Sequence, residues 1–386
     1  KKPNSIFEKD YYPGDYIKSI SEKIYTKKLD YKNDSSLEKN SLNLIMEDIK
    51  KDLKKIKVLH HTFVSEKKIS TKKNIDKLLD DLSKKDLSYH GYQDKPKSVS
   101  DENWKSEKQL LFKSKKLGDD SDRALLKPNG GLTYFISDIM YHQNKIERNF
   151  DFLINVWGVD HSGYVKRLKN AIKELNRDKL FVFEVKLTAL VNLLERKKAV
   201  KMSKRAGSYV TLRDVVDKVG VDVLRFMMIS RNADKKIDFD FEIVKNKTKD
   251  NPVFYVQYAY ARCMSLINIF NQTFNLSFTD SNIEDKKLSD LNLVEEKILI
   301  RKLCNFFNII ISAANSYEPH KLTNYLFDLA KDFHAYWALG KLEPSKKIIV
   351  ENNFEISQER ITLVFGISLI IKKGLGLLKI NCPESM

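Results

Sequence analysis

Apolar residues recur at helical spacing over much of the chain, and this pattern separates regions of different character. Toward the amino-terminal end, three polar, lysine-rich segments show the 3.6-residue period of amphipathic helices: 16–29, 42–53 and 75–87. Beyond residue 251, four longer segments rich in aromatic residues show the same period: 255–270, 294–312, 321–339 and 356–378. The pattern predicts a peripheral helical part followed, much later in the chain, by a separate helical bundle.

The middle of the chain has the pattern of a parallel α/β sheet. The apolar run 152–157 ends at Gly158 and is typical of a buried parallel strand. Segment 165–175 then has helical spacing, and 180–194 is apolar again. Strand, helix and strand make half of a doubly wound sheet. We therefore expect an α/β plus all-α fold with three domains: an inserted or peripheral part over 1–118, part of a Rossmann-like domain over 119–250, and a helical domain over 251–386.

Composition narrows the classes of function. The formal net charge of +17 favours a polyanionic partner, nucleic acid first, although a lysine-biased composition explains it equally well. No apolar run looks long and charge-free enough to cross a membrane. The three cysteines are scattered without metal or disulfide spacing, which fits a reducing cytosol. Because the chain opens with Lys and not with Met, we expect a fragment or a processed form.

A basic loop, Lys201-Met202-Ser203-Lys204-Arg205, follows the second apolar segment and precedes Ala206-Gly207. Two ammonium groups and a hydroxyl on a glycine-hinged loop suit a polyphosphate, because lysine is a mobile point charge for phosphate oxygens. By itself, a solvated charged loop is the better interpretation.

The stretch from Trp157 to Gly163 is a candidate nucleotide site. It lies at the carboxyl end of the predicted strand, where ligands bind in open α/β sheets. Gly158 allows close approach to the backbone, and Asp160 and His161 offer polar edges to a ribose or an adenine. The alternative is that Asp160 and Ser162 only cap the next helix.

Tyr134 and Asp138 form a second candidate, since they lie one turn apart on the same face if 132–139 is helical. A phenol beside a carboxylate suits a planar cation such as a guanidinium. A helix pair with no ligand is the alternative. In the aromatic segment 251–262, the tyrosines and Arg262 have the chemistry to stack on unpaired bases, while core packing explains most of the aromatic positions.

Taken together and in this order, these stretches resemble the class I arginyl-tRNA synthetases of bacterial type. The matching segments are 14–17, 63–66, 118–123, 132–139, 156–161, 201–207 and 251–262, and the carboxyl terminus resembles the family's natural end. The resemblance implies ATP-dependent attachment of L-arginine to tRNA(Arg) through arginyl-adenylate. It also implies that Mg²⁺ arrives with ATP and is not held by protein ligands, and that the protein is a cytoplasmic monomer that binds no membrane.

Carried over position by position, the resemblance assigns roles to individual residues. The groups that stabilise the departing pyrophosphate are Lys201, Ser203 and Lys204. Arginine binding is assigned to Tyr134, Asp138 and His161. ATP binding is assigned to Gly158, Asp160, Met202 and Lys204. For contact with tRNA we select, within the helical domain, Tyr258, Arg262, Trp337 and Met386.

The chain departs from the family in one important respect. None of its seven histidines stands in the His-x-Gly-His signature of class I synthetases, and Arg205 occupies a position that is usually Ser. We therefore expect a carboxy-terminal portion that is inactive alone. The alternatives are a non-catalytic tRNA-binding protein derived from a synthetase, another class I synthetase, and a helical scaffold. In another class I synthetase, a buried Asp138 without a cation would be costly. A helical scaffold leaves the basic loop unexplained.

Overall fold

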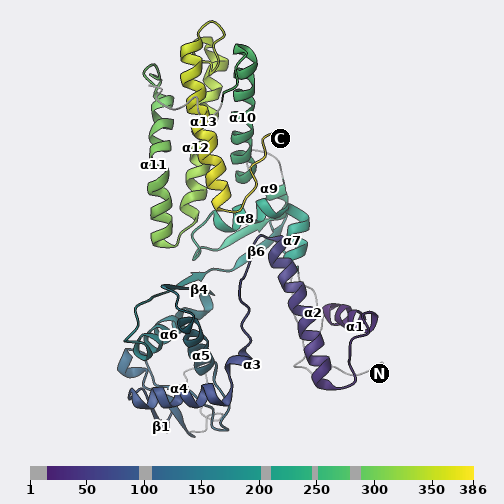
Figure 1. Cartoon of the computed structure of the whole chain (residues 1–386), viewed down its shortest axis with the longest axis vertical. Helices are drawn as coiled ribbons and strands as arrows, with labels where there is room; N and C mark the ends of the chain where they lie inside the picture. The colour runs from purple at the N-terminus through teal and green to yellow at the C-terminus, as the bar shows by residue number, and fades with distance from the viewer. Residues whose placement is uncertain (1–14, 95–106, 201–209, 246–250, 279–287) are drawn as a thin grey trace. The chain divides into compact units, whose positions relative to one another are not determined.

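The computed structural model describes residues 15–94, 107–200, 210–245, 251–278 and 288–386. They form two compact units (Figure 1). Residues 60–190 make up the central unit, and the described parts of 1–59 and 191–386 make up the flanking unit. The three domains expected from the sequence remain a proposal.

The central unit contains the parallel strand pair that the sequence predicts. Strand β4 (Phe152–Gly158) pairs with β5 (Val182–Thr188) in parallel, from Phe152 opposite Val182 to Gly158 opposite Thr188. The crossover runs through a 3-10 turn, η3 (Val159–His161), and helix α6 (Ser162–Leu175). The predicted order of strand, helix and strand is therefore confirmed.

Helix α5 (Tyr134–Glu147) packs beside α6, and Leu153 of β4 lies in the same buried cluster as Ile139 of α5 and Leu168 of α6. The remaining elements of the unit are α3 (Glu66–Ile69), α4 (Lys72–Lys84), η2 (Lys115–Leu117) and an antiparallel sheet of β1 (Ser88–Tyr92), β2 (Lys108–Phe112) and β3 (Arg123–Ala124).

The expectation that β4 is buried on both faces is wrong. Phe152, Ile154 and Val156 are 61%, 45% and 68% exposed, whereas Leu153 and Asn155 between them are buried. The physical reason is that α5 and α6 cover the face of Leu153, and among the described residues only β5 pairs with β4. The continuous apolar run of the sequence therefore becomes one packed face and one open face.

The flanking unit holds a second small sheet. Strand β6 (Val191–Glu195) pairs antiparallel with β7 (Lys198–Ala199) and parallel with β8 (Ile237–Asp240). Its core is shared by helices α7 (Leu212–Val219), α8 (Val221–Ile229) and α9 (Phe241–Lys245). Gly220, at φ 83°, separates α7 from α8, so the amphipathic pattern of apolar residues over 212–228 forms two helices. Two further helices, α1 (Asp15–Thr26) and α2 (Asp34–Lys55), pack on each other.

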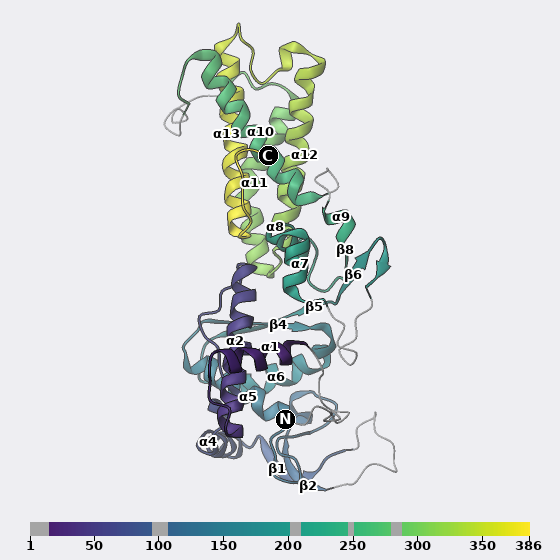
Figure 2. The same cartoon turned by 90° about the vertical axis from the view of Figure 1, so that its right-hand side faces the viewer.

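Four long helices form the predicted bundle, and they stand side by side in both views (Figure 1 and Figure 2). They are α10 (Pro252–Phe274), α11 (Val294–Ser316), α12 (His320–Leu342) and α13 (Phe354–Leu377), followed by a short non-helical tail. The first begins after Asn251, whose side chain accepts a hydrogen bond from the Phe254 amide, with Pro252 at the first helical position.

Helix α11 corrects one sequence expectation. By length and composition it is apolar enough to cross a membrane, and 11% of its apolar 18-residue stretch is buried. Its inner face, however, carries Leu299 and Phe306 into the bundle core, and its buried Glu296 pairs with Arg360 of α13. We therefore assign α11 to the bundle.

Candidate functional site

A cavity of about 190 Å³ lies against the first two turns of α5. The helix starts after Thr133, whose hydroxyl donates to the carbonyl oxygens of Ala124 and Leu125 at 2.9 Å. The structure places Tyr134 and Asp138 in this one cavity. The other lining residues come from α5 and from the segment around α3: Val64, Glu66, Ile69, Ser137 and Tyr141. Two carboxylates, Glu66 and Asp138, therefore line a cavity that also has phenol walls.

The two predicted residues differ in how they are held. Tyr134 is 90% exposed, so its ring is open to contact by a ligand. Asp138 is half-buried and accepts a 2.8 Å hydrogen bond at Oδ2 from the Tyr164 hydroxyl. The cavity thus combines a free aromatic face with an anchored carboxylate.

The turn after β4 carries the candidate nucleotide residues. The side chains of Asp160 and His161 are largely exposed and approach each other at 3.6 Å between Oδ2 and Nε2. A Cβ on Gly158 would stand 2.3 Å from Asp160 Oδ1, so that carboxylate lies directly over the glycine. The capping alternative is wrong, because α6 begins after His161 without any side-chain cap.

Tyr164 joins these two parts of the site. Its ring centroid lies 5.8 Å from that of Trp157, and Trp157 lies 6.0 Å from His161. Since the Tyr164 hydroxyl reaches Asp138, residues 134–138 and 157–161 are linked through one aromatic side chain. The sequence singled out both segments but not the residue between them.

His142, one turn beyond Asp138, has a structural role that the sequence left unassigned. Its Nδ1 lies 2.7 Å from the Asp138 carbonyl oxygen, and its Nε2 lies 2.7 Å from the Asn155 amide nitrogen. Burial lowers its pKa, so the ring is neutral and bonds through both nitrogens. Lys145 donates to Asn155 Oδ1 at 2.8 Å, and burial lowers the pKa of this lysine to about 8. The group fastens α5 to β4.

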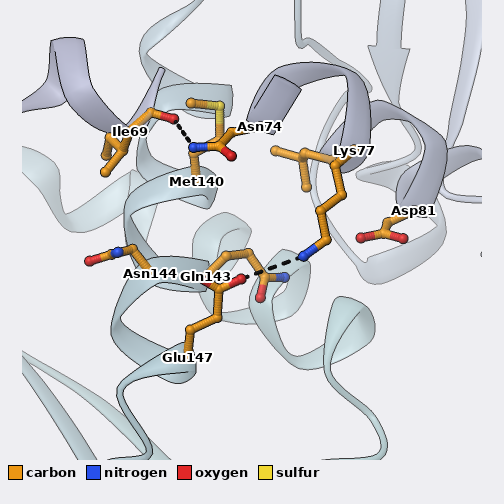
Figure 3. A pocket seen from close by; sticks show the side chains of 9 residues that line it. Ile69, Asn74, Lys77, Asp81, Met140, Gln143, Asn144 and Glu147 are labelled. Carbon is orange, nitrogen blue, oxygen red and sulfur yellow. Dashed lines mark hydrogen bonds and ion pairs between the residues drawn. The ribbon is translucent and has the colours of Figure 1, made fainter. Parts of the chain in front are cut away.

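A second, smaller cavity of about 110 Å³ lies between α4 and the later turns of α5 (Figure 3). Its polar rim includes the Lys77–Glu147 ion pair at 3.6 Å and the bond from Asn74 Nδ2 to the Ile69 carbonyl at 2.8 Å. It contains none of the site residues predicted from the sequence.

The basic loop lies outside the described residues. That applies to four predicted site residues: Lys201, Met202, Ser203 and Lys204. Both flanks of the loop are described. The β6–β7 hairpin precedes it, and a capping box between Thr211 and Asp214 starts α7 after it.

Three of the residues selected for tRNA contact gather on α10 and α12. The Arg262 guanidinium lies 3.6 Å from the Trp337 ring centroid and 4.6 Å from that of Tyr258. It donates to the Tyr258 hydroxyl at 3.0 Å and to His334 Nδ1 at 2.8 Å. Burial lowers the pKa of His334 to about 4, so this ring accepts that bond as a neutral group. The Lys341 ammonium lies 4.2 Å from the centroid of the same Trp337 ring and extends this cationic and aromatic cluster.

Met386 is placed elsewhere on the same unit. It lines a cavity of about 670 Å³ together with Asn381, Phe254 and Gln257. Phe254 stacks on Tyr258 with centroids 6.1 Å apart, so this cavity adjoins the cluster. Within the described parts of the chain, no three His, Cys, Asp or Glu side chains are grouped to hold a metal ion.

Comparison with known proteins agrees with this architecture. Residues 256–386 match the DALR anticodon binding domain. The chain is 43% identical over 383 residues to the arginine–tRNA ligase of Wolbachia pipientis subsp. Culex pipiens (strain wPip), covering 98% of this chain and 66% of that protein. It is 38% identical over 387 residues to the arginine–tRNA ligase of Pelagibacter ubique (strain HTCC1062), covering 99% and 66%.

The chain therefore spans 66% of the length of these relatives. Among solved structures, a putative arginyl-tRNA synthetase from Campylobacter jejuni matches with a TM-score of 0.81 at 24% identity, over 99% of this chain and 78% of that one. At that identity the likeness shows the fold alone. The sequence relatives, the DALR match and the shared class I fold together show that the chain belongs to the arginyl-tRNA synthetase family.

Proposed function

We propose that this chain carries the arginine-binding, pyrophosphate-binding and tRNA-binding parts of an arginine–tRNA ligase. The observation that carries the proposal is the α5 cavity, in which Glu66 and Asp138 face a space bordered by the open Tyr134 ring. Two carboxylates and a phenol face suit a guanidinium, which pairs with carboxylates through a planar fork and rests on aromatic rings. His161, linked to this cavity through Trp157 and Tyr164, completes the proposed arginine site.

The reaction needs two further groups of residues. The arginine carboxylate attacks the α-phosphorus of ATP, and pyrophosphate leaves. We assign ATP contact to Gly158, Asp160 and Met202, and neutralisation of the departing pyrophosphate to Lys201, Ser203 and Lys204. Mg²⁺ is expected to arrive on ATP, since it prefers phosphate and water ligands. A hydroxyl of the terminal ribose of tRNA(Arg) then attacks the carbonyl carbon of arginyl-adenylate, and AMP leaves.

Contact with tRNA is assigned to the bundle. Tyr258 and Trp337 offer aromatic surfaces for stacking, Met386 offers an apolar contact, and Arg262 with Lys341 supplies positive charge. A cytoplasmic monomer is the proposed working form.

The absence of His-x-Gly-His limits what the polypeptide does by itself. In the family these histidines stabilise the α-phosphate, and removing one such donor commonly costs about 2.7–4 kcal/mol. We expect no useful rate of arginine-dependent exchange between ATP and pyrophosphate by the 386-residue chain. Appreciable exchange in the presence of tRNA would overturn this part of the proposal.

The arginine site is tested by binding. Asp138→Asn should weaken arginine binding strongly and leave ATP binding nearly unchanged, measured by calorimetry. The matched control is Asp178→Asn, which makes the same change at an exposed position of the same unit. Equal losses for arginine and ATP would remove Asp138 from guanidinium recognition.

The second candidate is a non-catalytic tRNA-binding protein. It is favoured by the cationic and aromatic cluster on α10 and α12. For either function, tRNA binding should weaken steeply with salt, and Lys341→Gln should lower the log–log slope by about 1. Lys331→Gln, an exposed change on the same helix, serves as the control. Tight tRNA binding without any arginine binding would favour the second candidate.

A further inference from the structure

Tyr164 is held in an aromatic and cationic frame on the first turn of α6. Its ring centroid lies 6.0 Å from that of Phe135, edge to face at 79°, and 5.8 Å from that of Trp157. The Arg167 guanidinium lies over the ring at 5.6 Å. These three neighbours hold the ring, and its hydroxyl donates to Asp138 Oδ2 at 2.8 Å.

We propose that Tyr164 is a positioning residue: its hydroxyl sets the plane of the Asp138 carboxylate and thereby the preference of the cavity for a guanidinium over an uncharged ureido group. The inference rests on the proposed arginine site. A carboxylate offers about four acceptor positions. Tyr164 occupies one of them, and among the described residues no other hydrogen bond reaches this carboxylate. The other acceptor positions of the Asp138 carboxylate are left for a ligand, and the bond from Tyr164 has already oriented them.

Prior orientation matters because a bidentate ion pair requires the guanidinium and the carboxylate to be coplanar. A carboxylate free to rotate would lose that freedom on binding, and the loss would weaken the complex. Burial, with the nearby Asp138 charge, raises the pKa of the Tyr164 phenol. The hydroxyl therefore keeps its proton and stays a donor at neutral pH.

The frame is supported from a segment that had no assigned role. Asp119 accepts from Arg167 Nε at 2.7 Å and from Arg123 Nε at 3.1 Å. Burial alone would raise the pKa of Asp119, but these two arginines outweigh it and hold the pKa well below its usual value. The matched segment 118–123 thus steadies Arg167, which steadies the Tyr164 ring.

The test is calorimetric binding of arginine and of citrulline, its uncharged ureido analogue, to the full 386-residue chain. Tyr164→Phe keeps the ring and its packing and removes only the hydroxyl. We expect arginine affinity to fall about 2- to 10-fold, the usual cost of ordering one side chain when a ligand binds. Citrulline affinity should change little, so the ratio of the two affinities should fall by nearly the same factor.

Tyr89→Phe is the matched control. The Tyr89 hydroxyl also donates to a carboxylate, that of Asp122, at 2.8 Å in the same unit but outside the cavity. It should leave both affinities unchanged. In an Asp138→Asn background, Tyr164→Phe should have no further effect on arginine, because the carboxylate it orients is gone.

The remaining outcomes separate the two levels of the argument. If the unmodified chain does not prefer arginine to citrulline, the proposed arginine site is wrong and the positioning role falls with it. If it does and Tyr164→Phe leaves the ratio unchanged, or weakens both ligands equally, only the positioning role is overturned. Should Tyr164→Phe fail to fold by circular dichroism, Arg167→Lys replaces it. That variant keeps the charge but loses the planar group over the ring, and an unchanged ratio would again refute the inference.

Discussion

The buried ion pair between α11 and α13 yields the sharpest prediction about the bundle. Glu296 is 0% and Arg360 is 7% exposed, and Arg360 Nε lies 3.0 Å from Glu296 Oε1. Arg360→Met removes the cation with little loss of volume and leaves the carboxylate buried. Breaking a buried pair from one side commonly costs about 3–5 kcal/mol.

The structure places the expected cost at the lower end of that range. Glu296 keeps a bond from the Tyr336 hydroxyl at 2.9 Å and one from the Leu293 amide at 3.0 Å, so it is not left without donors. The two carbonyls that Arg360 also bonds, those of Ser345 and Lys347, belong to exposed residues. We therefore expect about 3 kcal/mol.

Hydrogen exchange followed by mass spectrometry measures this locally, which matters in a chain of two units. Protected amides of α11 and α13 should exchange about 100-fold faster in Arg360→Met. Arg301→Met, the same change at an exposed position of α11, should leave them unchanged. Adding Glu296→Gln to Arg360→Met should restore much of the protection, since it removes the uncompensated charge. An acceleration below about fivefold in the single variant would refute the reasoning.

Three further predictions concern both units. Asp119→Asn should lower the free energy of unfolding of the central unit by roughly 1.5–3 kcal/mol at pH 7, measured by urea denaturation. The folded pKa of Asp119 lies well below its unfolded value of about 3.9. Its stabilisation is therefore full above that unfolded value and is lost progressively as the pH falls toward the folded pKa, so the gap between wild type and variant should be narrower at pH 3 than at pH 7 but not closed. Val156→Lys should reduce aggregation measured by light scattering, because the open face of β4 is apolar. Val294→Lys is the control and should not reduce it, although Val294 is 69% exposed and Val156 is 68% exposed. In thermal unfolding, Gly374→Ala should destabilise the bundle by about 1–3 kcal/mol, because the new Cβ would lie 2.7 Å from Leu326 of α12. Gly376→Ala should stabilise the bundle by about 0.5–1 kcal/mol, because a Cβ there meets nothing within 4 Å.

The candidate site was partly readable from residue spacing. Tyr134 and Asp138 share a cavity because residues four apart lie on one face of a helix, a relation set by local backbone geometry. The turn after β4 was recognisable for a similar reason, since it follows a strand that its own apolar run predicts. Glu66 appeared only as part of a matching segment, and nothing in its spacing indicated that α3 lies against α5.

Long-range pairs gave no such signal. Tyr164 and Asp138 are 26 residues apart, Arg262 and His334 are 72 apart, and Glu296 and Arg360 are 64 apart. Each pair contains ordinary surface residue types, and no periodicity relates its members. Which of these residues pair depends on which helix faces meet, and packing decides that.

The chain's own pattern determined its helices, its parallel strand pair and the residues that share one helical face, because these follow from periodicities of 3.6 and 2 residues along a local backbone. Tertiary structure alone decided that β4 has one open face, that the stretch 212–228 bends at Gly220, and that Tyr164 fastens Asp138. Burial, helix contacts and hydrogen bonds between distant residues exist only once the elements have packed, since an isolated segment carries no information about which surface will cover it.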